Sequence, residues 1–259
     1  MITEEQILAN WEIFIKLISQ HIPGKRGEKL VKFYEEHSDR FATMPASGNT
    51  KFHNAFPGGY IDHVLNVYHN ATALYKVWAD QGAFMNDFKF EELMFATLNH
   101  DLGKFGTEEG DYYVNQTSDW HRNRGEVYTH NAEISYMKTS DRSLYILQNL
   151  GVELSENEYL AIKLHDGLYE ESNKGYYVSY SDSYRLRSHL SYILHQADLM
   201  ASRIEYDNVN RPAIKSITTS TVKLEQAEKA SVGSTFTAKP KAVPVKRKMS
   251  GKYAHLLNK

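Results

Sequence analysis

Apolar residues recur at helical spacing through most of this sequence, and this periodicity limits the chain to a largely helical fold. The segment from Tyr60 to Trp78 shows it most plainly, because its apolar positions 61, 64, 65, 68, 71, 74, 75 and 78 would form one stripe along a helix. Near the start, Thr3-x-x-Gln6 has the pattern of a capping box, and the apolar residues after it predict a helix up to Pro23-Gly24. The sequence therefore predicts an all-α fold.

Further helices are expected from the same pattern at 28–36, 90–100, 130–138, 141–150, 156–166 and 185–206. The only strand pattern is a weak one at 176–180. Long loops at 41–59 and 104–129 interrupt the helices, and loops of this length in compact domains usually serve a function.

The chain divides into three parts. These are an N-terminal helical extension (1–40), a main domain (41–207) and a basic C-terminal tail (208–259). We expect the tail to be disordered, because much of it is rich in Ala, Pro, Lys and Val.

Composition narrows the cellular setting. Hydrophobic residues make up 41% of the 259 residues, enough for a sizeable core, yet no apolar run approaches the roughly 18 residues of a membrane-spanning helix. The first residues are acidic and lack the pattern of a signal peptide. There is no cysteine, which excludes disulfides, thiolate nucleophiles and zinc-thiolate sites. We therefore expect a cytoplasmic protein without a membrane partner.

Charge is unevenly distributed along the chain. No acidic residue follows Glu228, whereas eight Lys or Arg residues do, so this last segment has a formal charge of +8 and the rest of the chain −10. An acidic body is not typical of a general nucleic-acid binder. Any contact with a polyanion or a partner protein through bulk charge would come from the tail, and the sequence leaves the oligomeric state open.

A His-Asp doublet stands at one expected helix end. His100-Asp101 follows an apolar helix and precedes Gly103, and at a helix end two adjacent side chains can reach one ion. Imidazole beside carboxylate suits a divalent metal such as Mn²⁺ or Fe²⁺, although Mg²⁺, Co²⁺ and Ni²⁺ also bind such sets.

Other residues of the same kinds lie where they could join this doublet. Asp198 interrupts an apolar helix face, His195 lies one turn before it, and a buried carboxylate needs a cation nearby. His63 lies on another apolar helix face, and His130 and His165 lie at expected helix edges. The sequence therefore predicts a metal site.

The sequence motifs around these residues resemble those of the HD superfamily of metal-dependent phosphohydrolases. Three segments are similar to the HD domain of YhaM-type 3′-to-5′ exoribonucleases: FATMPASGNTKFHNAFPGGYIDHVLNVYHNA, NHDLGKFG and LHQADLMASRIE. The resemblance covers roughly residues 41–206. It implies an HD-type helical bundle around a central metal site, with long functional loops. The N-terminal OB-fold of YhaM-type proteins has no counterpart here, because residues 1–40 are too short and too helical for one.

The resemblance also implies roles for individual residues. His63, His100, Asp101 and Asp198 would hold a first metal ion. His130 and His165 would bring in a second, or they would make hydrogen bonds or contact substrate around a single ion. Asp101, Lys104 and His195 are the expected catalytic residues, with Lys104 contacting a phosphate and His195 positioning or protonating the leaving oxygen. In the long loop, Trp120, Arg122 and Arg124 are candidates for binding substrate, or they fold the loop onto the bundle.

We therefore expect a phosphohydrolase that cleaves a phosphoester in a nucleotide or short nucleic acid by metal-activated water. One alternative is a true 3′-to-5′ exonuclease, which the motif wording and the basic tail favour. Another is a non-catalytic, metal-bound module that binds a nucleotide or a partner protein.

Overall fold

The computed structural model describes residues 2–179 and 181–210 of the chain. Most of these residues are helical, in agreement with the expected all-α class, and the only sheet among them has two short strands. None of the described helices is long and apolar enough to span a membrane. The predicted disorder of the basic tail concerns residues that lie almost wholly outside the described ones.

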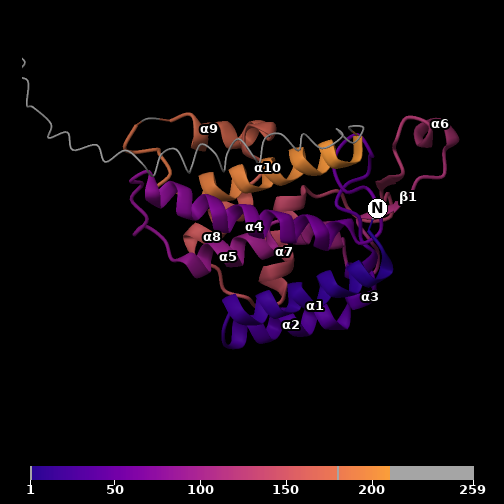
Figure 1. Ribbon diagram of the computed structural model, residues 1–259, viewed down its shortest axis with the longest axis horizontal. Helices are drawn as coiled ribbons and strands as arrows, with labels where there is room; N and C mark the ends of the chain where they lie inside the picture. The colour runs from indigo at the N-terminus through magenta and orange to yellow at the C-terminus, as the bar shows by residue number, and fades with distance from the viewer. Residues whose placement is uncertain (1, 180, 211–259) are drawn as a thin grey trace, which may run out of the picture. The chain divides into compact units, whose positions relative to one another are not determined.

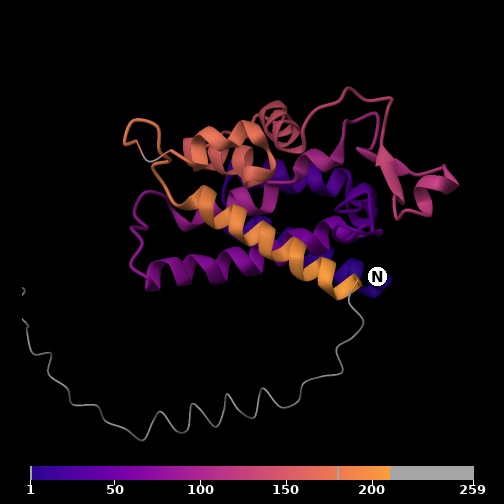
Figure 2. The same cartoon turned by 90° about the horizontal axis from the view of Figure 1, so that it is seen from above.

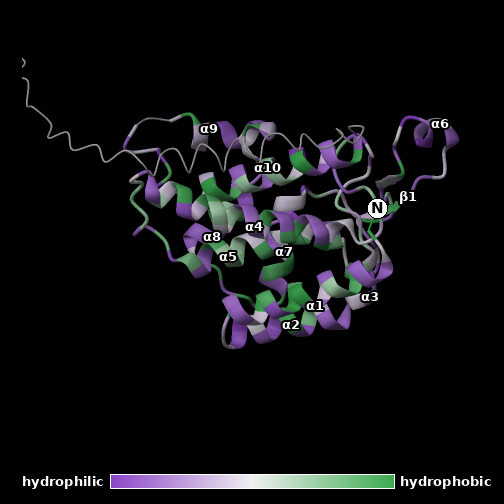
Figure 3. Cartoon of the chain, in the orientation of Figure 1, coloured by the Kyte–Doolittle hydropathy of each residue, from purple (hydrophilic) through white to green (hydrophobic). Residues whose placement is uncertain are grey.

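The core of the molecule consists of packed central helices: α4 (Gly59–Asp80), α5 (Phe90–Asn99), α8 (Glu156–Leu164) and α10 (Leu190–Asn210). Helix α10 packs along α4 and α8, and α5 contacts α4, α8 and α10 (Figures 1 and 2). Every residue of α5 from Leu93 to Asn99 is buried, because a short helix that is apolar on all sides needs neighbours all round. The buried apolar residues of these helices belong to one core cluster. Figure 3 shows the hydropathy of each residue along the same helices.

The N-terminal helices belong to the same core. They are α1 (Glu4–His21), α2 (Lys25–Glu36) and α3 (Ser38–Thr43). Thr3 and Gln6 form the expected capping box, and α1 packs against α4 and α5 through buried Phe14 and Ile18. The expected N-terminal extension is thus packed onto the rest of the bundle rather than standing apart from it.

The segment after α5 is fixed by α7 (Thr139–Asn149). A 3₁₀ turn, η1 (Leu102–Phe105), packs against α7 so closely that a Cβ on Gly103 would lie 2.1 Å from the Thr139 carbonyl oxygen. The Ser143 hydroxyl donates to the His100 carbonyl at 2.8 Å and accepts from the Gly103 amide at 2.7 Å. These bonds hold the chain immediately around the His100-Asp101 doublet.

The structure corrects the expected helix at 130–138. Strands β1 (Tyr113–Asn115) and β2 (Tyr128–His130) pair antiparallel, with Tyr113 opposite His130, and frame the short helix α6 (Asp119–Arg122). Beyond His130, the Asn131 side chain donates to the Asp111 carbonyl and accepts from the Glu133 amide. Such local Asx bonding competes with helix formation, so α7 begins only at Thr139.

The expected strand at 176–180 is also wrong over its described residues, 176–179. Residues 167–177 form the 3₁₀ turns η2 (Gly167–Tyr169) and η3 (Glu171–Asn173) and the one-turn helix α9 (Lys174–Tyr177). The Tyr177 hydroxyl lies 2.9 Å from the Leu164 carbonyl oxygen and 3.3 Å from that of Ser191, so this aromatic side chain packs the turn onto α8 and α10. Helix α10 begins at Leu190, five residues later than expected.

Candidate metal centre

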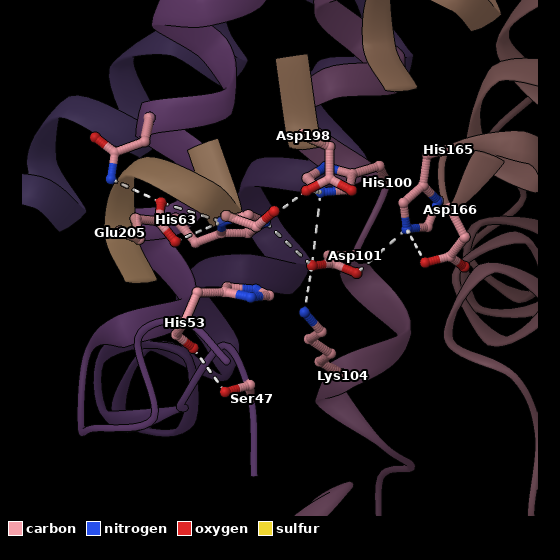
Figure 4. A network of polar contacts seen from close by, with 12 residues as sticks. Ser47, His53, His63, His100, Asp101, Lys104, His165, Asp166, Asp198 and Glu205 are labelled. Carbon is pink, nitrogen blue, oxygen red and sulfur yellow. Dashed lines mark hydrogen bonds and ion pairs between the residues drawn. The ribbon is translucent and has the colours of Figure 1, made fainter. Parts of the chain in front are cut away.

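Five of the predicted ligands meet in the middle of the bundle (Figure 4). His63 is buried on α4, and Asp198 faces it from α10. His100 and His165 are the C-caps of α5 and α8, and Asp101 follows His100 directly. The helical framework thus joins residues that are up to 135 positions apart in the sequence.

Two of the three histidines are oriented by their own helices. The Nδ1 atoms of His100 and His165 each lie 2.8 Å from the carbonyl oxygen three residues earlier, in Thr97 and Ile162 respectively. A carbonyl oxygen only accepts, so each Nδ1 is the protonated donor. In both rings Nε2 is therefore the nitrogen that faces the cluster with its lone pair, or with an added proton.

His63 is oriented by a carboxylate instead. Its Nδ1 lies 3.0 Å from Glu205 Oε2, and Asn66 donates to the other Glu205 oxygen at 2.9 Å. A carboxylate behind the imidazole of a metal ligand fixes the tautomer and makes the opposite nitrogen a stronger ligand. The Nε2 of His63 is thereby directed to the cluster in the same way as those of the other two histidines.

The donor atoms of these five residues form two triads that share His100, namely His63, His100 and Asp198, and His100, Asp101 and His165, and each triad is spaced as ligands of one ion are. Asp198 Oδ1 lies 3.1 Å from His63 Nε2, Asp101 Oδ2 lies 3.5 Å from His100 Nε2, and Asp101 Oδ1 lies 3.6 Å from His165 Nε2. Donors about 2.1 Å from a shared ion are separated from one another by roughly 3 to 4 Å. The Nε2 atoms of His63 and His100 are buried and make no hydrogen bond of acceptable geometry within the described chain. This donor set fits a divalent metal.

Burial and the nearby carboxylates shift the pKa values of the histidines in opposite directions. Burial lowers the pKa of His63, but the Glu205 and Asp198 carboxylates outweigh it and raise the value to about 10. His165 behaves in the same way, since burial is outweighed by Asp166 and Asp101, which raise its pKa to about 10. For His100, burial dominates and lowers the pKa to about 4. The carboxylates thus create a field that favours a cation.

Lys104 contributes a positive charge to the same cluster. Its ammonium Nζ lies 2.5 Å from Asp101 Oδ2, and the side chain is only 10% exposed. Burial alone would lower the pKa of Lys104, but Asp101 raises it well above its ordinary value. Burial likewise acts to raise the pKa of Asp101, and Lys104 with His100 holds it well below the usual range. Lys104 is therefore an internal counter-ion of the cluster.

His130, expected to help bind a second metal, is not brought into this cluster. His130 lies on strand β2, and its ring centroid is 4.8 Å from that of Tyr112 and 5.7 Å from that of Tyr136. His195, the expected proton donor, does lie next to the cluster, because its Nδ1 is 2.8 Å from the His165 carbonyl oxygen. That bond leaves its Nε2 available to a ligand.

Trp120, Arg122 and Arg124, the candidate substrate-binding residues of the long loop, lie between strands β1 and β2. Trp120 is 60% exposed, and Arg124 stacks over its ring at 4.5 Å. Arg122 pairs with Asp119 and donates to the Gln116 carbonyl. These contacts hold the loop together, and none of the three residues lines the pocket that opens beside the candidate metal centre.

Two residues at the cluster were missed by the reading of the sequence. Glu205 follows Asp198 by seven positions, and this spacing puts both carboxylates on one helix face. That spacing could have revealed it. The ring of His53 lies 4.6 Å from that of His63, and its buried Nε2 has no hydrogen-bond partner within the described chain. Burial lowers the pKa of His53 to about 3, so this imidazole is neutral.

A pocket of about 320 Å³ opens beside the cluster. Its lining includes Asp198, Lys104, His195, Asp166 and His53. A ligand in this pocket would therefore contact a carboxylate of the cluster, the buried lysine and the free side of His195 together.

Comparison of the chain with protein-family models, curated proteins and solved structures gave no match. The function is therefore inferred from the geometry of this site. Buried imidazoles with fixed tautomers, carboxylates and a lysine beside an open pocket are suited to holding a metal ion against an anionic ligand.

Proposed function

We propose that this protein is a metal-dependent phosphohydrolase that cleaves a phosphoester in a nucleotide or short nucleic acid. One observation carries the proposal: three histidines, each held at Nδ1, present Nε2 to Asp101 and Asp198 at the edge of an open pocket. The resemblance of the motifs around these residues to HD phosphohydrolases points to the same chemistry.

His63, His100, Asp101, His165 and Asp198 would hold the ion or ions. A divalent ion bound there supplies an acidified water nucleophile and neutralises charge on the phosphoryl oxygens. Mn²⁺ and Fe²⁺ suit the mixed nitrogen and oxygen ligands best, and Mg²⁺, Co²⁺ or Ni²⁺ would serve according to supply.

The chain's own side chains would act on the substrate from the pocket. Lys104 lines the pocket with an ammonium group that can bind a phosphoryl oxygen as a point charge. His195 is held at Nδ1 by the His165 carbonyl, so its Nε2 can hold a proton for the departing oxygen. The bundle keeps both groups in place before the substrate binds.

The test combines metal content with hydrolysis. Wild-type protein should retain Mn²⁺ after gel filtration and hydrolyse bis-p-nitrophenyl phosphate only when metal is present. His63→Ala should lose both properties. The matched control is His69→Ala, which removes an exposed histidine from the same helix and should leave both at the wild-type level.

Substrate choice separates the alternatives. Release of single nucleotides from one end of a labelled oligonucleotide would support exonuclease activity, whereas turnover of free nucleotides alone would support a nucleotidase. Metal binding without turnover of any phosphoester would reject the phosphohydrolase and favour a binding module. Wild-type protein that binds no Mn²⁺ or Fe²⁺ would reject the metal centre itself.

A further inference from the structure

Two basic side chains of the pocket have no role in the chemistry described so far. Lys51 and Arg203 line the same 320 Å³ pocket as Asp198 and Lys104. Both are exposed, and neither forms an ion pair with any residue that the structure describes. Their charges are thus available to an anion in the pocket.

Arg203 is positioned away from the metal ligands along α10. It follows Asp198 by five residues, which corresponds to a rise of about 7.5 Å along the helix axis. Its Nη2 donates to the Tyr169 hydroxyl at 2.5 Å, so the guanidinium is anchored to the pocket wall by a neutral partner. An anchored guanidinium that keeps its full charge is well suited to bind a phosphate.

Lys51 approaches the same region from the loop between α3 and α4. The neighbouring Thr50 carbonyl accepts from the side chain of Asn210, two turns beyond Arg203 on α10. The Lys51 amide donates to Asn49 Oδ1 at 2.9 Å, which fixes the backbone of this turn. Lys51 thus lines the pocket from a loop that contacts the C-terminal end of α10, beyond Arg203. Asp198 lies before Arg203 on the same helix.

We propose that Lys51 and Arg203 form a second phosphate subsite, which selects substrates that have another phosphate group beyond the one being hydrolysed. The inference rests on the proposed phosphohydrolase function for the first phosphate. Phe52, Tyr169 and Tyr206 also line this pocket, and aromatic rings can stack on a base. The second phosphate comes either from the next phosphodiester of an oligonucleotide or from the polyphosphate of a nucleotide.

Pairs of small ligands that differ by one phosphate test the subsite. The first pair is a thymidine dinucleotide with and without a terminal phosphate, which is placed at the 5′ end or at the 3′ end. The second pair is a nucleoside diphosphate and its monophosphate. Binding of each is measured by calorimetry on the full chain in EDTA, and hydrolysis is then measured with Mn²⁺. The extra phosphate should strengthen binding to wild-type protein about tenfold in at least one pair.

The ratio of the two affinities within a pair, with and without the extra phosphate, should fall to about one in the double variant Lys51→Ala, Arg203→Ala. Its matched control, Lys76→Ala, Arg185→Ala, removes the same charges from exposed positions outside the pocket and should keep the wild-type ratio. The ligand pair whose affinity ratio falls to one in the pocket variant identifies the source of the second phosphate. A wild-type ratio of one in both pairs, or a ratio unchanged in the pocket variant, would overturn the subsite.

Failure of the proposed function would show separately. Wild-type protein that hydrolyses none of these ligands with Mn²⁺ would contradict the phosphohydrolase, whereas the binding ratio in EDTA would still decide whether the subsite exists. If the pocket variant loses helical content by circular dichroism, Lys51→Gln and Arg203→Gln measured singly decide the outcome, each with about a threefold fall in the ratio expected.

Discussion

The helix ends at His100-Asp101 and His165-Asp166 are built alike but differ in what their carboxylates do. In both, a histidine is the C-cap of its helix with a φ near −60°, donates from Nδ1 to the carbonyl three residues earlier, and precedes a 3₁₀ turn. The two imidazole rings lie 4.9 Å apart. The same local pattern thus supplies one imidazole from each of two helices.

The carboxylates diverge because their surroundings differ. The Asp101 side chain is 5% exposed and is paired with buried Lys104. Asp166 is 48% exposed and lines the pocket, with its Oδ1 3.7 Å from His165 Nε2. A His-Asp doublet at a helix end therefore specifies where the imidazole goes, whereas the packing beyond it decides whether the carboxylate joins the cluster.

The largest effect should come from exchanging the two carboxylates for amides in turn. Asp101→Asn should remove metal binding and hydrolysis, and after chelation it should lower the free energy of unfolding by about 3 kcal/mol, because buried Lys104 is left unpaired. Asp166→Asn should lower it by less than about 1 kcal/mol, since this carboxylate is half exposed. Metal content and urea unfolding in EDTA measure both, and equal losses in the two variants would contradict the comparison.

The third histidine sharpens the comparison, because its anchor can be changed by mutation. Glu205→Gln replaces the carboxylate behind His63 by a neutral amide, whereas His100 and His165 keep their backbone anchors. Such changes typically weaken metal binding 10- to 100-fold, so a loss of about this size is expected in a Mn²⁺ titration. Asn70→Ala, which removes a side-chain bond to the Ala197 carbonyl, is the control on the same helix pair. A Mn²⁺ affinity that Glu205→Gln leaves unchanged would remove Glu205 from the site.

Metal binding should depend on pH, and Asp166 should modulate that dependence. In the metal-free protein, the pKa values of His63 and His165 are raised to about 10. Below that pH a metal ion must displace their protons, so its affinity falls as the pH falls. Asp166→Asn should lower the pKa of His165 and reduce the number of protons released on binding. Calorimetry in buffers of different ionisation enthalpy counts these protons, and a pH-independent affinity would contradict the prediction.

The smallest effect concerns the turn after the second doublet. Gly167 has a φ of +57°, and a Cβ there would lie 2.1 Å from the His195 ring. Gly167→Ala should leave the fold intact, at a cost of about 1 kcal/mol, while displacing His195 from the His165 carbonyl. A fall of several-fold in kcat with unchanged metal content is expected, and wild-type kinetics would show that His195 has no role.

Most of the helices and most of the candidate metal ligands could be predicted from the sequence. Helical spacing and capping boxes located α1, α4 and α8 closely, because these signals are local. His63, His100, Asp101, His165 and Asp198 all lie together as expected. These residues share an apolar helix face or a helix end, and burial of those faces brings the side chains to one centre.

The rest depended on contacts that the sequence pattern does not contain. Strands β1 and β2 have three residues each, too few to show alternation, and their pairing turns His130 towards Tyr112 rather than the cluster. His53 lies in a loop whose turn at Asn54 has a φ of 44°, and only packing against His63 gives it a place at the site.

The pairing of Lys104 with Asp101 bears on the order of events after synthesis. In small zinc proteins, folding waits for the metal because the site does not exist in the unfolded chain and the free energy of metal binding drives folding. Here Lys104 neutralises Asp101, a buried carboxylate of the cluster, from within the same stretch of chain. Under the proposed function, a newly made copy would therefore reach its folded shape without the ion and be loaded with it later, so that scarcity of the ion would stop hydrolysis and leave the fold in place.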